Sequence, residues 1–194
     1  MKQLFDKLTS FLGLFFLSPL FIIIYLLIRI KMRGGSPLFI QERVGKDGIL
    51  FKMVKFRTMI AGHSGSSISV AGESRITPLG AVLRKYKIDE LPALWNVLKG
   101  DMSFVGPRPD VPGYADKLIG KDRLILKLKP GITGPASLKY SNEEEILAQK
   151  EDPIKYNDEV IYPDKVKINL DYYYNHTFYG DLKIIMNTIF RTNY

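Results

Sequence analysis

The sequence contains no cysteine, and histidine occurs only at His63 and His176. The absence of thiols excludes disulfide bonds and thiolate metal ligands. Two histidines also supply little material for a histidine-based metal centre or a catalytic triad. The chemistry of this chain of 194 residues must therefore come from carboxylates, lysines, arginines and backbone groups.

Charged side chains are also absent from Phe11 to Ile28, a run of 18 residues. A helix of that length rises about 27 Å, close to the hydrocarbon thickness of a bilayer. Ser18 and Pro19 interrupt the run near its middle. Proline kinks a helix and leaves one carbonyl without its donor, which in lipid requires a local substitute such as the Ser18 hydroxyl. The sequence therefore predicts a membrane helix that bends at Ser18 and Pro19.

Two topologies are open to this helix: it either crosses the bilayer or enters one leaflet and returns. Positive side chains flank it on both sides, namely Lys2, Lys7, Arg29, Lys31 and Arg33. Positive residues prefer the cytoplasmic side of a membrane. Because both flanks are positive, the charges give no orientation for a crossing helix. They favour a re-entrant helix with both ends in the cytoplasm.

The net charge of +8 is unevenly distributed along the chain. Residues 29–129 carry a net charge of +10, whereas residues 130–194 carry −3. A basic region next to a membrane helix is attracted to anionic headgroups and to phosphate-bearing ligands. Nucleic acid is the usual alternative partner of a basic stretch. We expect no nucleic-acid partner here, because the anchor would hold the protein at the membrane.

The remaining residues are enough for one compact domain, so we divide the chain into 1–33, the membrane helix with its basic flank, and 34–194, a single compact domain. The pattern predicts an α+β fold that is mainly helical, with one small β-hairpin and interfacial amphipathic helices. We expect two short strands, at 38–41 and 49–59, joined by a turn at 44–48, and then a loop at 60–76. Helices are expected to begin at Pro78 and to cover about 89–99, 114–128, 143–150 and 165–174, with a turn at 129–134. The apolar stretch at 182–190 is expected to lie on the membrane. Trp95 is expected in the core, because it shares helical spacing with Leu91 and Leu98.

Asp89 and Glu90 are the most chemically informative pair in the chain. They open a predicted helix directly after a basic run at 84–87. A helix N-terminus favours negative charge and forms a phosphate site. An ionised aspartate can attack phosphorus, and it can also bind Mg²⁺ through oxygen. The alternative is that both residues only cap the helix.

Three cations are candidates for phosphate binding. Arg108 lies between Pro107 and Pro109, and two fixed φ angles would present its guanidinium on a stiff loop. Lys55 and Arg57 share one face of a predicted strand and could clamp a phosphate. A structural ion pair is the alternative for Arg108, and a solvated strand face is the alternative for Lys55 and Arg57.

Taken together, these segments resemble the bacterial sugar transferases, specifically the small monotopic phosphoglycosyl transferases that act on polyprenyl phosphate. The resemblance covers nearly the whole chain. It rests on the kinked helix, on KFRTM at 55–59, on KIDELPALWNVLKGDMSFVGPRP at 87–109, on KPGITG at 129–134 and, more weakly, on DLKIIMNTI at 181–189.

The resemblance implies transfer of a phosphosugar from a UDP-sugar to a polyprenyl phosphate carrier, with Mg²⁺ as cofactor and UMP as a product. It assigns Asp89 as the nucleophile that forms a covalent phosphosugar and touches the metal, and Glu90 as its assisting base or ligand. It assigns Arg108 to the diphosphate or lipid phosphate, with Lys55, Arg57 and Arg84 as supporting cations. It places the protein on the cytoplasmic face of the bacterial plasma membrane, with membrane lipid, downstream glycosyltransferases and a second copy of the chain as further partners.

The stretch after KPGITG departs from the family pattern. Many relatives carry a glutamine and then a Gly-Arg-Asn element, whereas residues 135–142 here read PASLKYSN. Lys139 is the candidate replacement for the missing arginine. The acidic insert at 143–163 is also unlike the shortest members, so sugar recognition is not carried over. The other functional class considered is a non-catalytic scaffold that binds anionic lipid, but lipid binding alone requires no carboxylate pair.

Overall fold

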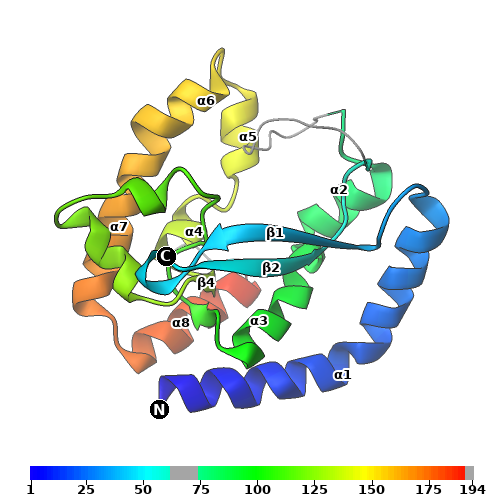
Figure 1. The fold of residues 1–194 in the computed structure, drawn as a ribbon, viewed down its shortest axis with the longest axis horizontal. Helices are drawn as coiled ribbons and strands as arrows, with labels where there is room; N and C mark the ends of the chain where they lie inside the picture. Colours follow the sequence, from blue (N-terminus) through cyan, green and yellow to red (C-terminus); the bar gives the residue numbers. More distant parts are fainter. Residues whose placement is uncertain (62–73, 191–194) are drawn as a thin grey trace. The chain divides into compact units, whose positions relative to one another are not determined.

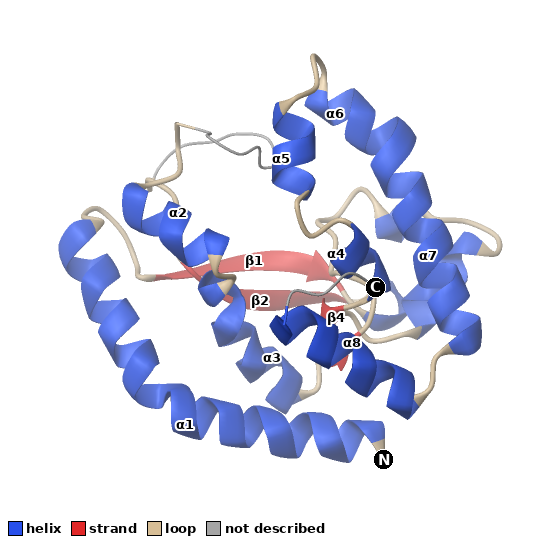
Figure 2. Ribbon diagram, turned by 180° about the vertical axis from the view of Figure 1, so that it is seen from behind, coloured by secondary structure: helices blue, strands red, loops and turns tan. Residues whose placement is uncertain are grey.

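The computed structural model describes residues 1–61 and 74–190, and the predicted loop at 60–76 falls largely outside them. The described residues are mainly helical, with short strands (Figures 1 and 2). The elements are α1 (Lys2–Lys31), β1 (Leu38–Val44), η1 (Lys46–Gly48), β2 (Leu50–Phe56), α2 (Pro78–Lys85), η2 (Ile88–Ala93), α3 (Leu94–Lys99), β3 (Ser103–Val105), η3 (Ala115–Lys117), η4 (Asp122–Lys127), β4 (Gly131–Thr133), α4 (Pro135–Lys139), α5 (Glu143–Ala148), α6 (Pro153–Tyr156), η5 (Asn157–Ile161), α7 (Tyr162–Asn175) and α8 (Phe178–Phe190).

Contacts among the described residues divide the chain into two compact units. The first unit contains Met1–Glu42 and residues 52–61 and 74–100, and the second contains Arg43–Phe51 and residues 101–190. The boundary predicted after residue 33 separates the apolar helix from the rest of the sequence. This grouping by contacts does not test that boundary, which stays a prediction. Each unit is described by itself below.

Helix α1 dominates the first unit and continues through Pro19. Proline at position 19 removes the donor that would bond to the carbonyl oxygen of Phe15. The Ser18 hydroxyl donates to that same carbonyl oxygen at 2.7 Å. This confirms the predicted local substitute, and Figure 1 shows the helix bent along its length.

Helix α1 is long and apolar enough to cross a membrane. It buries Ile24 and Ile28, while large apolar side chains along the rest of the helix are exposed, including Leu4, Phe11, Phe15, Phe16, Ile22, Ile23 and Ile30. Exposed apolar surface of this extent is typical of a helix that contacts lipid. The prediction of an N-terminal apolar helix is therefore confirmed.

Part of the hairpin and helix α2 complete the core of the first unit. Strands β1 and β2 form a two-stranded sheet, which confirms the predicted hairpin. Phe56, at the end of β2, packs with Leu83 of α2 against the C-terminal part of α1. Helix α2 begins as predicted, because the Thr77 hydroxyl accepts a hydrogen bond from Gly80 N at 3.0 Å and Pro78 occupies the first turn.

The second unit is built around a short parallel sheet that was not predicted. Strand β3 pairs with β4 in the register Ser103 to Gly131 and Val105 to Thr133. The predicted turn at 129–134 therefore contains a strand. Helices α4, α7 and α8 pack around these strands, with Val105, Tyr172 and Ile184 buried together.

Two further predictions for the fold are wrong. Residues 114–128 form the short 3₁₀ turns η3 and η4 rather than one helix, because Gly120 between them adopts φ +58°. Trp95 is 54% exposed rather than buried. Leu94, Asn96 and Val97 are the buried residues of α3, and Trp95 lies on its exposed side.

Helix α8 confirms the predicted C-terminal apolar stretch and extends it to Phe178. It buries Asp181 and Ile184, and Tyr172 of α7 donates to Asp181 Oδ1 at 2.5 Å. Met186 and Ile189 are exposed on α8. Such a face is expected of a helix on a membrane surface, and that location stays a prediction.

Candidate active site

The Asp89–Glu90 pair lies in η2, in the first unit. The predicted α-helix begins here as a 3₁₀ turn, preceded by Lys87 at φ +57°, and becomes α-helical only at Leu94. Asp89 is 8% exposed and Glu90 is 7% exposed. Because burying two adjacent carboxylates is unfavourable unless they gain partners, the residues around them determine what this pair can do.

Lys55 supplies one such partner. Its Nζ lies 2.8 Å from Glu90 Oε1, and both side chains are largely buried. A buried pair of this kind keeps the carboxylate ionised and fixes its position. The structure therefore joins two residues that the sequence separates by 35 positions.

Asn96 fixes the strand that carries Lys55. Its side chain donates to Lys52 O at 2.8 Å and accepts from Val54 N at 3.1 Å, and the residue is 1% exposed. These two hydrogen bonds attach β2 to α3. Asn96 was not singled out from the sequence, because an asparagine in a helix gives no signal of its distant partner.

The carboxylate of Asp89 is buried beside Glu90, and its Oδ1 lies inside the protein. An oxygen of this kind suits a nucleophile or a cation ligand.

Arg57 and Arg84 belong to the same unit as the carboxylate pair. Arg57 is 7% exposed, and its Nη2 donates to the carbonyl oxygen of Met32, at the C-terminal end of α1. Gly35 leaves space for this guanidinium, because a Cβ at Gly35 would lie 2.6 Å from Arg57 Nη1. The structure thus gives Arg57 a role at the C-terminal end of α1, while its role toward phosphate stays a prediction. Arg84 lies half-buried on α2.

Arg108 lies in the second unit, on a loop that follows β3. Pro107 and Pro109 on either side are buried, and Arg108 itself is half-buried. Gly131 N donates to the Pro107 carbonyl oxygen at 2.8 Å. The predicted stiff presentation of Arg108 therefore has a structural basis in buried prolines and in pairing with β4.

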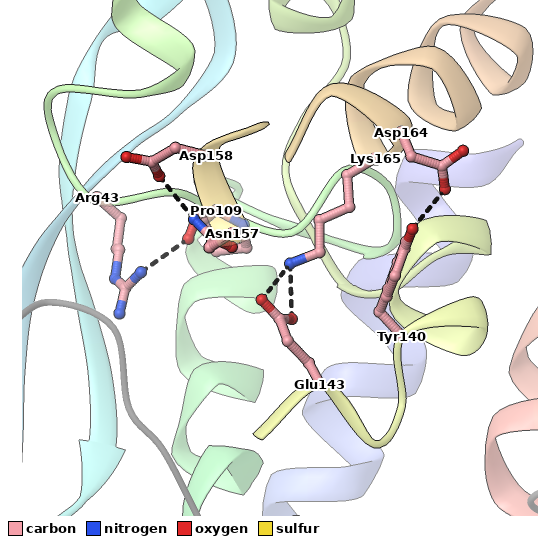
Figure 3. A network of polar contacts seen from close by, with 8 residues as sticks. All are labelled: Arg43, Pro109, Tyr140, Glu143, Asn157, Asp158, Asp164 and Lys165. Carbon is pink, nitrogen blue, oxygen red and sulfur yellow. Dashed lines mark hydrogen bonds and ion pairs between the residues drawn. The ribbon is translucent and has the colours of Figure 1, made fainter. Parts of the chain in front are cut away.

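Asp110 ends this loop among charged side chains. Burial raises the pKa of Asp110 to about 6, although the nearby cations Lys165, Arg43 and Arg108 act in the opposite direction. Lys165 is itself held by Glu143, at 2.6 and 2.7 Å from the two carboxylate oxygens (Figure 3). The acidic insert thus contributes directly to the charge environment of the loop.

This raised pKa predicts a pH-dependent stability. A carboxyl with a higher pKa in the folded state than in the unfolded state loses stability as pH rises between the two values, here from about 4 to about 6. We expect Asp110→Asn to match wild type below pH 4 and to be more stable above pH 6, by at most about 3 kcal/mol. Thermal unfolding in detergent from pH 4 to 8 measures this, with the exposed Asp122→Asn as control. A constant difference at all pH values would contradict the prediction.

Lys139, the candidate replacement for the missing arginine, pairs within the second unit. Its Nζ lies 2.6 Å from Asp164 Oδ2, and Tyr140 donates to the same oxygen at 2.7 Å. The hydrogen bonds from these two residues hold the pKa of Asp164 below its usual value. Lys139 is half exposed, so its predicted role toward the nucleotide-sugar stays a prediction.

The structure thus brings Lys55 and Glu90 together, and it places Asp89, Arg57 and Arg84 in the same unit as that pair. Arg108 and Lys139 belong to the other unit. Sequence reasoning missed Arg43, Asn96, Asp110 and the Glu143–Lys165 pair. Of these, only the clustering of charges around 108–110 left any signal in the sequence.

The chain is similar to known proteins over nearly its whole length. A sequence model described as Bacterial sugar transferase matches residues 1–193. The chain is 34% identical to the sugar transferase EpsL of Bacillus subtilis, over 97% of this chain and 85% of that protein. It is 31% identical to the exopolysaccharide production protein ExoY of Rhizobium meliloti, over 97% and 83%. It is also 31% identical to the UDP-glucose:undecaprenyl-phosphate glucose-1-phosphate transferase of Caulobacter vibrioides, over 97% and 68%.

Proposed function

Since the chain belongs to the bacterial sugar transferase family, and is therefore an enzyme, we propose that it transfers a phosphosugar from a UDP-sugar to polyprenyl phosphate. The products are a polyprenyl-diphosphate-linked sugar and UMP, and the step begins glycan assembly. The observation that carries the proposal is the buried Asp89–Glu90 pair, with Glu90 fixed by Lys55. Membership of an enzyme family excludes the non-catalytic scaffold.

The proposed chemistry proceeds in two displacements at one phosphorus atom. A carboxylate oxygen of Asp89 attacks the sugar-bearing phosphorus, the bond to the bridging oxygen breaks, and UMP leaves. An oxygen of the polyprenyl phosphate then attacks the same phosphorus and releases the Asp89 carboxylate. Glu90 stays ionised beside Lys55 and assists as base or ligand. The reaction requires neither histidine nor cysteine, because positioning and charge neutralisation supply most of its catalysis.

Mg²⁺ fits this set of donors. No cluster of three or more acidic or histidine side chains suited to a metal occurs among residues 1–61 and 74–190. Mg²⁺ commonly uses only one or two carboxylates together with substrate phosphates and waters. Asp89, with its buried Oδ1, is the residue that would hold the ion. When bound, the ion would neutralise charge on the phosphates.

The basic residues would bind the phosphate groups of the two substrates. Arg108 would bind the diphosphate or the lipid phosphate through its planar guanidinium. Arg57, Arg84 and Lys139 would add positive charge, and Lys55 acts first through Glu90. We place the reaction on the cytoplasmic face of the bacterial plasma membrane, where the polyprenyl phosphate headgroup lies, with membrane lipid, downstream glycosyltransferases and a second copy of the chain as further partners.

UMP release tests the proposal directly. Purified protein with undecaprenyl phosphate and Mg²⁺ should release UMP from at least one member of a panel of UDP-sugars, and the active member identifies the donor. Release should depend on the lipid acceptor for multiple turnovers. Binding of anionic vesicles without UMP release from any donor would contradict the enzymatic proposal.

We also propose that α1 is re-entrant, with both ends in the cytoplasm. The bend at Pro19 and the positive charges on both flanks support this topology. Because the native chain contains no cysteine, single cysteines replacing Lys2 and Lys46 can report accessibility without background. We expect both to be protected from a membrane-impermeant maleimide in intact cells and to react after lysis. Labelling of the Lys2 position from outside would show that the helix crosses the bilayer.

A further inference from the structure

We propose that Arg43 is a positioning residue for Arg108, because it holds the loop that presents that guanidinium. This inference rests on the proposed function of Arg108 in phosphate binding. Nothing in the sequence singled out Arg43, which lies near the end of β1, 65 positions before Arg108. The structure places both residues in the second unit.

The first contact joins the Arg43 side chain to the loop. Its Nη1 donates to the carbonyl oxygen of Pro109 at 3.0 Å, as Figure 3 shows. The next residue adds a second contact, because Val44 N donates to the Asp110 carbonyl oxygen at 2.9 Å. The end of β1 therefore holds the two carbonyls that directly follow Arg108.

The preceding side of Arg108 is held by a different strand. Gly131 N donates to the Pro107 carbonyl oxygen at 2.8 Å, and Gly106 N donates to Thr133 O at 2.9 Å. Strand β4 thus holds the loop before Arg108, and the end of β1 holds it after Arg108. The backbone is fixed on both sides of a single half-buried arginine.

These contacts matter because Pro107 and Pro109 have no N–H to donate. A loop of this composition is held by its carbonyls, and each lost donor leaves a carbonyl oxygen to find a new partner. The Arg43 charge also acts on Asp110, the carboxyl two residues beyond Arg108. Removing Arg43 would therefore loosen the loop and change the charge next to Arg108 together.

The chain offers a matched control in Arg123. Its Nη1 also donates to loop carbonyl oxygens of the second unit, to Asp116 O at 3.0 Å and Leu118 O at 3.2 Å. Those carbonyls lie outside the segment 105–113. Arg123→Met therefore removes an arginine that holds a loop but leaves the Arg108 segment unchanged.

The experiment compares Arg43→Met, Arg43→Gln and Arg123→Met in the full-length protein. Hydrogen exchange of the 105–113 segment measures loop opening, and UMP release gives kcat and KM for the UDP-sugar. We expect both Arg43 variants to speed exchange in 105–113 and to raise KM about tenfold, with a smaller change in kcat. Arg123→Met should leave both measurements at wild-type values.

A double-mutant cycle with Arg108→Lys shows whether Arg43 acts through Arg108. Positions that act through one another are not additive, so Arg43→Gln should cost less than about threefold in the Arg108→Lys background. Equal costs in both backgrounds, or unchanged exchange in 105–113, would overturn the proposal. If the wild type releases no UMP from any donor, the proposed function fails by itself, and the exchange comparison still decides whether Arg43 holds the loop.

Discussion

Asp89→Asn should abolish the covalent phosphosugar adduct and lower UMP release by about 10³-fold or more, as expected when an enzyme loses its nucleophile. An amide has nearly the same shape as the carboxylate but cannot attack phosphorus or release a phosphosugar. Intact-protein mass spectrometry after addition of the UDP-sugar without lipid acceptor measures the adduct. Wild type should gain the mass of one phosphosugar, and the variant should gain none.

Two comparisons make this result specific to Asp89. Glu90→Gln should turn over much more slowly but still form the adduct, because Asp89 remains in place while the Lys55 ion pair is lost. The exposed Asp122→Asn should behave as wild type. An Asp89→Asn enzyme with near-normal turnover, or an adduct that persists in it, would contradict the assignment of Asp89 as nucleophile.

Local chemistry explains which parts of the fold were predictable. Ser18, Thr77 and Gly100 act within three or four residues of their own position. Ser18 bonds the carbonyl left by Pro19, Thr77 caps α2, and Gly100 ends α3 at φ +98°. Such signals can be read from neighbouring letters. They located the kinked helix, the start of α2 and the end of α3.

The arrangement around the site depends on distant partners, which a single sequence does not give. The sequence shows a lysine at position 55 but does not show whether its side chain faces solvent, a phosphate or Glu90. The ion pair with Glu90 can be identified only in the folded chain, where β2 lies beside η2. Trp95 is likewise exposed, although its spacing with Leu91 and Leu98 matches one helix face, because α3 buries Leu94, Asn96 and Val97 instead. The parallel pairing of β3 with β4 has no local turn signal, because the strands are separated by 25 residues or more.

The glycines of VGPRP and KPGITG have a steric explanation in the structure. A Cβ at Gly106 would lie 2.2 Å from the Lys129 carbonyl oxygen, and one at Gly134 would lie 2.3 Å from the Gly106 carbonyl oxygen. At Gly131 a Cβ would meet Gly106 N at 2.2 Å. The two strands approach so closely that no side chain fits between their backbones. These motifs therefore fix the base of the Arg108 loop.

Gly106→Ala should consequently destabilise the protein by about 3 kcal/mol or more, at the upper end of the range for overpacking. The conflicting atoms belong to the backbone, so no flexible side chain can move away. A loss of that size lowers the melting temperature by roughly 6–12 °C for a chain of this length. Thermal unfolding in detergent measures the shift.

Gly120→Ala is the matched control for this substitution. Gly120 adopts φ +58° with nothing within 4 Å of its Cβ position, so alanine there meets only the cost of a left-handed backbone, about 1 kcal/mol. Gly106→Ala should therefore lose at least twice as much stability as Gly120→Ala. It should also lose UMP release at temperatures where it remains folded, because the loop that follows the displaced strand carries Arg108. A Gly106→Ala protein as stable as Gly120→Ala would show that β3 and β4 can separate without loss, and that close backbone approach is not what these glycines provide.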